Sequence, residues 1–79
     1  MSLDRHWELR ISKDGVSKYV TDIKGFPIVM EFGSAADCQP MWFVSQAEAE
    51  IWWSLYQKSK PADATGWTAY FEEVIHHGE

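Results

Sequence analysis

The stretch SQAEAEIWWSLYQKS, residues 45–59, is the strongest helix signal in the chain. Ser45 followed three residues later by Glu48 is a capping box, in which each side chain satisfies a free backbone N–H at the start of a helix. The helix is expected to run to about Lys58 and to end before Pro61, which cannot continue it. One helix is therefore predicted here, and the rest of the fold has to be built around it.

The apolar surface of this helix is wider than one packing face. At about 100° per residue, the apolar side chains of residues 47–56 cover an arc of about 200°. A helix on a sheet needs an arc of only about 100°. Trp52 lies at the centre of the arc and is expected in the core. Ile51 and Trp53 lie at opposite rims, so one rim is expected to face outward.

Trp53 is the better candidate for exposure, because Gln46, Glu50 and Gln57 flank it on the wheel. The alternative, that the loop 33–40 or the tail folds over it, remains open. An exposed Trp is costly and is typical of interface hot spots. The residues expected to form a protein-interaction surface are Trp53, Ile51, Glu50, Gln57 and Glu48.

The segments before the helix have the pattern of strands. Residues 6–12 alternate apolar and polar side chains with a period of two, and residues 17–23 can form the return strand. Residues 26–32 are expected to form a third strand, with Pro27 at its start or on an edge. Residues 41–44 are apolar and β-prone, which favours a short fourth strand leading into the helix.

The turn between the first two strands sets their register. A three-residue turn with Gly15 as the bulge pairs Leu9 with Tyr19. It keeps Lys18 and Asp22 off the core face, whereas a two-residue Asp14-Gly15 turn would place both charges on it. Because a one-residue slip moves every side chain to the other face, the three-residue turn is predicted.

The last two segments complete the layout. Residues 33–40 are small and polar and are expected to form a mobile loop. Residues 66–75 have a helical period, but their aromatic and β-branched content favours a strand. The order β-β-β-(β)-α-β predicts an α+β fold, a small antiparallel sheet of four to five strands with one helix on one face. Residues 1–79 are expected to form a single domain.

Composition and charge narrow the class of protein. The chain of 79 residues has 15% aromatic residues and one cysteine, so aromatic side chains rather than disulfides must build the core. No segment reaches the roughly 20 apolar residues of a membrane span, and the N-terminus has no leader-like apolar run, which favours the cytoplasm. Residues 31–79 hold two basic and eight acidic side chains, which disfavours direct nucleic-acid binding.

No catalytic or metal-binding pattern is present. The adjacent His76 and His77 lack the spaced Cys or His partners of a zinc site. Cys38 has no cation near it in sequence, so a plain free thiol is expected. On a strand, Glu72 and Glu73 point to opposite faces and cannot act as a paired acid and base. No enzyme activity, metal or cofactor is therefore expected.

The segment PMWFVSQAEAEIWW, residues 40–53, resembles the strand–Ser-cap–helix unit of many small phage and bacterial proteins of unknown function. The short, acidic and aromatic-rich profile is similar to that of phage-encoded inhibitors such as anti-CRISPR proteins. This resemblance implies no activity.

The leading functional hypothesis is a small non-enzymatic domain that binds another protein, in particular a second copy of itself through the helix rim. The alternative is an acidic inhibitor, of the phage anti-defence or nucleic-acid-mimic type, that blocks a basic site on a target protein. A third hypothesis is a small-ligand pocket lined by Trp42, Trp52 and Trp67. For a heterologous protein partner, a basic docking surface is expected.

Overall fold

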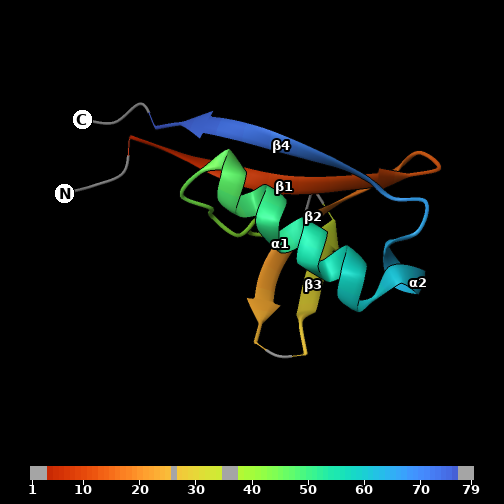
Figure 1. Cartoon of the computed structure of the whole chain (residues 1–79). Coiled ribbons are helices and arrows are strands. Elements are labelled where there is room, and N and C mark those ends of the chain that lie inside the picture. The colour runs from red at the N-terminus through yellow and green to blue at the C-terminus, as the bar shows by residue number, and fades with distance from the viewer. Residues whose placement is uncertain (1–3, 26, 35–37, 77–79) are drawn as a thin grey trace.

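The computed structural model describes residues 4–25, 27–34 and 38–76. Its elements in chain order are β1 (Arg5–Lys13), β2 (Val16–Lys24), β3 (Val29–Ser34), α1 (Gln46–Ser59), α2 (Pro61–Ala64) and β4 (Thr68–Ile75) (Figure 1). The strands form one antiparallel sheet in the order β3-β2-β1-β4. With α1 as the main helix, this confirms the predicted α+β class.

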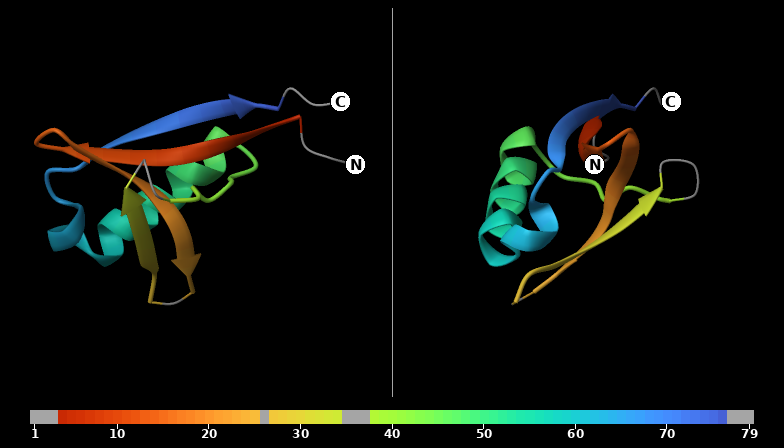
Figure 2. Two further views of the ribbon diagram at one scale, coloured as in Figure 1. Left: turned by 180° about the vertical axis from the view of Figure 1, so that it is seen from behind. Right: turned by 90° about the vertical axis from the view of Figure 1, so that its right-hand side faces the viewer.

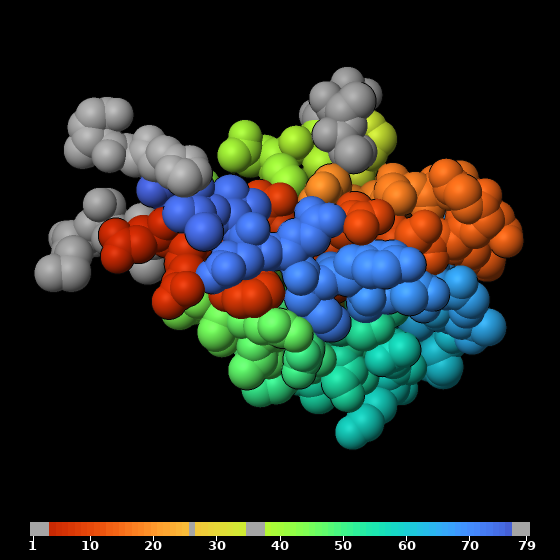
Figure 3. Space-filling view, turned by 90° about the horizontal axis from the view of Figure 1, so that it is seen from above, coloured from red at the N-terminus to blue at the C-terminus, as the bar shows by residue number. Residues whose placement is uncertain are grey.

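The sheet is strongly twisted around the helix. Strands β1 and β4 run together, whereas the β2–β3 hairpin turns away from them, and α1 lies on one face of the sheet (Figure 2). Seen from above, the atoms of β4 and α1 lie side by side (Figure 3). The sheet therefore has a covered face, toward α1, and an open face on the other side.

The C-terminal segment is a strand, as predicted. Strand β4 pairs with β1 over eight residues, from Arg5↔Ile75 to Ser12↔Thr68. Its aromatic and β-branched side chains suit a pleated surface, and β1 has a free edge that needs a partner. In the described part of the chain, β4 has no second strand beside it, so it forms one edge of the sheet.

The predicted three-residue turn between β1 and β2 is wrong. Arg10, not Leu9, lies opposite Tyr19, and the turn has two residues. Asp14 and Gly15 have φ values of 52° and 82°. Positive φ at both central residues is the geometry of a type I′ turn, whose twist matches that of the flanking strands, and Asp-Gly favours it.

A β-bulge in β2 explains why the two-residue turn does not place Asp22 on the core face. Val20 lies opposite Phe32 and Asp22 opposite Glu31, which leaves Thr21 as an extra residue in β2. The extra residue reverses the alternation, so that Val20 faces the core while Asp22 shares the exposed face of Glu31. Of the two charged residues Lys18 and Asp22, Lys18 alone stays on the covered face. It lies opposite Ile11, at the solvent-exposed end of that face.

Residues 41–43 occupy the gap where β2 leaves β1. The Met41 N–H donates to the Val20 carbonyl (2.8 Å), and Trp7 and Phe43 exchange two backbone hydrogen bonds of 2.9 and 2.8 Å. The predicted short strand at 41–44 is therefore a single β-bridge rather than a strand. Of the predicted mobile loop 33–40, residues 33 and 34 belong to β3, and residues 35–37 lie outside the described residues.

The helix start agrees with the sequence prediction in its main feature. The Ser45 hydroxyl accepts a hydrogen bond from the Glu48 N–H (3.1 Å), while the Glu48 carboxylate accepts one from the Val44 N–H (3.0 Å). The second bond reaches one residue further back than a standard capping box. Helix α1 ends at Ser59, and Pro61 starts the unpredicted short helix α2.

The core lies between the covered face of the sheet and the helices. Its buried side chains are Leu9, Ile11, Val20, Ile28, Met30, Phe43, Ala49, Trp53, Tyr56 and Ala64. Both helices fall short of the length and apolar character needed to cross a membrane, within the residues that the structure describes.

Candidate functional site

The buried side of α1 is not the predicted one. Ala49, Trp53 and Tyr56, spaced at i, i+4 and i+7, are only 0%, 7% and 6% exposed. The Trp53 ring stacks on Tyr56 with centroids 5.8 Å apart, and Tyr56 meets Phe32 of β3 edge to face at 5.8 Å. The prediction that Trp53 is exposed is therefore wrong, because these aromatic partners on α1 and β3 cover its rim. Trp52 is partly buried beside them.

The opposite rim of α1 carries an exposed apolar stripe. Ala47, Ile51 and Leu55 follow one another at intervals of four residues and so lie on one side of the helix. Ile51 is 60% exposed and Leu55 37%. Val44, just before the helix, is 69% exposed. Ile51, one of the predicted interaction residues, is therefore the exposed large apolar side chain on a helix rim that Trp53 was expected to be.

Charged residues flank this apolar stripe, which we define as Ala47, Ile51 and Leu55. Glu48 lies in the first turn of α1 and Lys58 in its last turn. Glu48 precedes Leu55 by seven residues, and Lys58 follows Ile51 by seven, so both lie beside the stripe. The apolar stripe is therefore acidic at one end and basic at the other.

Two further predicted interaction residues belong to the other side of α1. Glu50 and Gln57 are exposed, and the Glu50 carboxylate accepts a hydrogen bond from the Gln46 side chain (2.9 Å). They border the buried Trp53 and not the apolar stripe. The structure therefore does not bring all five predicted residues together.

The three tryptophans expected in one pocket lie in different places. Trp42 stacks on His6, with ring centroids 4.0 Å apart and an interplanar angle of 7°. Trp52 packs against the core, and Trp67 lines a cavity at the far end of the covered face. The hypothesis of a pocket formed by all three is wrong, because Trp42 alternates with the core residue Phe43 and so takes the opposite side.

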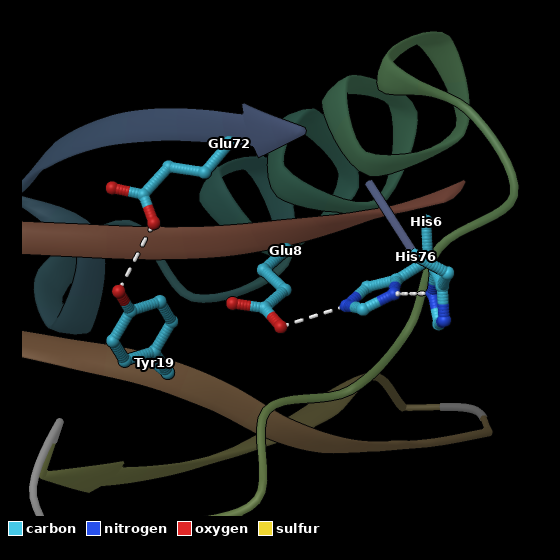
Figure 4. A network of polar contacts seen from close by, with 5 residues as sticks. All are labelled: His6, Glu8, Tyr19, Glu72 and His76. Carbon is cyan, nitrogen blue, oxygen red and sulfur yellow. Dashed lines mark hydrogen bonds and ion pairs between the residues drawn. The ribbon is translucent and has the colours of Figure 1, made fainter. Parts of the chain in front are cut away.

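The open face of the sheet holds a polar cluster that the sequence reasoning missed. His6 is only 3% exposed and contacts three side chains, of which Figure 4 shows Glu8 and His76. Its Nε2 lies 2.7 Å from a Glu8 carboxylate oxygen, its Nδ1 lies 2.7 Å from Nε2 of His76, and Trp42 covers its ring. This cluster fastens the end of β4 to the start of β1.

A second polar cluster on the open face is centred on Glu72. Its carboxylate accepts a hydrogen bond from Arg10 (2.8 Å) and another from the Tyr19 hydroxyl (3.0 Å), the second of which is drawn in Figure 4. Partial burial and this hydrogen bond raise the pKa of Tyr19, and the hydrogen bond to Glu72 raises the pKa of Arg10. The Arg10 guanidinium also lies 4.5 Å from the centre of the Tyr70 ring.

A signal for both clusters was present in the sequence. The even-numbered residues of β1 and β4 share the open face, because paired residues of adjacent strands point to the same side. The predicted strand at 66–75 already put Tyr70 and Glu72 on one face, but only the pairing of Tyr70 with Arg10 places Glu72 near Arg10. The contact of His6 with His76 required the exact pairing of the two strands.

The remaining predicted features stand apart from these surfaces. Glu72 and Glu73 point to opposite faces, as expected, and pair with Arg10 and Arg5 respectively. Cys38 is a partly buried free thiol. In the part of the chain that the structure describes, no group of three or more His, Cys, Asp or Glu side chains is placed to hold a metal ion.

No protein-family model matches the chain, and neither the curated proteins nor the solved structures include a significant match to it. Function therefore has to be inferred from the surfaces of this chain alone.

Proposed function

We propose that this protein is an interaction domain that self-associates through the apolar stripe of α1. The observation that supports the proposal most directly is the exposure of Ile51 and Leu55 on one side of a helix whose other side is already buried. Exposed large apolar side chains that form a contiguous row are typical of protein contact sites. The proposal keeps the interaction through the helix rim and moves it from Trp53 to Ile51.

A second copy fits the apolar stripe by shape. In an antiparallel pair of α1 helices with the two-fold axis at Ile51, the two Ile51 side chains meet. Ala47 of each copy then lies opposite Leu55 of the other, so a small residue faces a large one, as in well-packed helix pairs. A helix of 14 residues is about 21 Å long, so the whole stripe can take part.

The second copy also fits by charge. The antiparallel arrangement brings the acidic first turn of one α1, with Glu48, toward the basic last turn of the other, with Lys58. The two helix dipoles oppose each other in the same arrangement. A parallel pair would place like charges together. Charge complementarity therefore favours a two-fold antiparallel dimer over other arrangements of the stripe.

Sedimentation equilibrium over a range of protein concentrations tests the proposal. The wild type is expected to form a dimer, and Ile51→Glu is expected to be a monomer with an unchanged circular dichroism spectrum, because it places two carboxylates at the two-fold axis. Val29→Glu is the matched control, since Val29 is a 40% exposed apolar residue of β3. A wild type that stays monomeric at high micromolar concentration would contradict the proposal, as would a control variant that dissociates equally.

The alternative, an acidic inhibitor of a basic protein surface, needs unpaired carboxylates gathered on one surface. Four of the described carboxylates, those of Glu8, Glu31, Glu72 and Glu73, lie instead within ion-pair distance of a His, Lys or Arg side chain. This arrangement gives the inhibitor hypothesis less support than the dimer. Neither proposal needs an enzyme activity or a cofactor, and for both we propose a cytoplasmic location.

A further inference from the structure

A small cavity of about 210 Å³ opens at the end of the covered face, beside α2. Its walls are aromatic and come from three separate parts of the chain: Phe32 of β3, Trp53 and Tyr56 of α1, and Trp67 just before β4. Ile11 of β1 also lines it. Ligand sites are lined mainly by such apolar and aromatic side chains, with a few polar groups that set specificity.

Two lysines lie at one side of this aromatic cavity. Lys18 lines it, and the ammonium groups of Lys18 and Lys13 lie 5.8 and 5.9 Å from the centre of the Trp67 ring. Neither lysine has a carboxylate within 4.0 Å in the described part of the chain. By contrast, Arg5, Arg10 and Lys24 are all ion-paired.

The electrostatic balance at the cavity is positive in an acidic protein. Asp63 of α2 is the one carboxylate among the residues that line the cavity. With Lys13 and Lys18, the local formal charge is positive, although the whole chain has a net charge of −5. A concave site of one sign with low-dielectric walls attracts ligands of the opposite charge.

Lys18 is a charged residue on the covered face of β2, opposite the buried Ile11 and at the solvent-exposed end of that face. Positions that break the local rules of a fold are expected at functional sites. A charged group at the mouth of an aromatic cavity is useful when a ligand carries the opposite charge.

We propose that this cavity binds a small apolar carboxylate, with its ring or branched chain between Trp53 and Trp67 and its carboxylate at Lys18. Lys13 adds a second positive charge on the Trp67 side. The volume of about 210 Å³ is below the roughly 300 Å³ of a drug-sized pocket, so it accepts one ring rather than a larger ligand. The inference does not depend on the proposed dimer, because the apolar stripe does not line the cavity.

Phenylacetate, with phenylacetamide as its neutral isostere, is the first pair of probes. The full chain is titrated with each, and binding is followed by the NMR shifts of the Trp indole N–H groups. Phenylacetate is expected to bind with a Kd on the order of 1 mM, as suits a ligand of this size. Phenylacetamide is expected to bind about tenfold more weakly, because it lacks the charge-assisted bond to Lys18. Equal binding of the two probes, or no saturable shift, would overturn the proposal.

Three variants separate the role of Lys18 from a general effect of charge. Lys18→Gln should weaken phenylacetate about tenfold and leave phenylacetamide unchanged. Lys24→Gln is the matched control on the same strand, since Lys24 pairs with Glu31 at 3.2 Å, and it should change neither. Asp63→Asn should tighten phenylacetate, because it removes a like charge. A loss with Lys24→Gln as large as that with Lys18→Gln would refute the site.

The same chemistry can come from a free acid or from the C-terminal residue of a peptide. N-acetyl-glycyl-phenylalanine with a free carboxylate, compared with phenylacetate, distinguishes these sources: the source that binds more tightly is the natural one. If the peptide amide binds as well as the peptide acid, the carboxylate is not recognised and the proposal fails. The Ile51→Glu variant should bind phenylacetate like the wild type, so that failure of the dimer and failure of this site are told apart.

Discussion

The two rims of helix α1 differ in what lies opposite them. On one rim Trp53 is 7% exposed and stacks on Tyr56, which in turn meets Phe32 of β3, whereas on the other Ile51 is 60% exposed. Trp53 is bordered by the polar Glu50 and Gln57, which reach solvent along its edge. The comparison teaches that aromatic partners on the neighbouring elements decide which rim is buried, and that polar neighbours in the helix do not.

The sharpest test of this comparison is to truncate one large apolar side chain on each rim of α1. Trp53→Ala should lower the free energy of unfolding by about 3–5 kcal/mol, because it removes a buried ring of the core cluster that stacks on Tyr56. Ile51→Ala should change it by less than about 0.5 kcal/mol in the monomer. Urea unfolding at low protein concentration measures both. Equal losses would show that the two rims are equally buried.

The helix cap supports both rims and should have an intermediate effect. Ser45→Ala removes the hydroxyl that accepts the Glu48 N–H, at a cost of about 1 kcal/mol. The thermal midpoint should fall by roughly 4–8 °C for a domain of this size. Ser54→Ala, an exposed mid-helix position, is the control and should leave the midpoint unchanged or slightly raised. A similar fall in both variants would mean that the cap contributes nothing specific.

The smallest expected effect is a pH dependence of stability. It comes from Tyr56 on the buried rim and has no counterpart on the exposed rim. Burial, and then the nearby Asp63 charge, raise the pKa of Tyr56 above its ordinary value of about 10. The folded state therefore holds this proton more tightly than the unfolded state. Its contribution to stability is fully present below about pH 10 and is lost as the pH rises through the folded pKa.

Urea unfolding at pH 8 and pH 11 tests this dependence. The wild type should lose stability over this interval, and Tyr56→Phe should lose less. Part of the loss should remain in the variant, because the pKa of Tyr19 is raised in the same direction. A Tyr56→Phe variant with an unchanged pH dependence would show that Tyr56 does not contribute.

Much of the fold could be predicted from local patterns. The Ser45 cap, the extent of α1, the alternation in β1 and the strand character of β4 all depend on neighbours in sequence. The strand prediction for residues 66–75 succeeded against a competing helical period, because the side-chain types outweighed it. These features need no knowledge of distant contacts.

The main errors concern features that depend on distant contacts. The bulge at Thr21 forms where β2 leaves β1 and Met41 takes its place, which no local pattern near Thr21 indicates. Without the bulge, the two-residue turn seemed to bury Asp22. The side of α1 that is buried likewise depends on Phe32, which lies far from Trp53 in sequence.

The bulge at Thr21 has a consequence for how this chain can vary. An insertion or deletion of one residue in a strand normally inverts every side chain beyond it and is eliminated by selection. Here β2 already holds one extra residue, and the inversion is confined to the hairpin of β2 with β3. The alternation of side chains in the β1–β2 pairing is therefore independent of the alternation in the β2–β3 pairing, and the two meet at Thr21. Related sequences that lack Thr21 are expected to keep the same apolar pattern on both sides of the gap, because its loss leaves Val20 opposite Phe32 and Asp22 opposite Glu31 in a regular ladder.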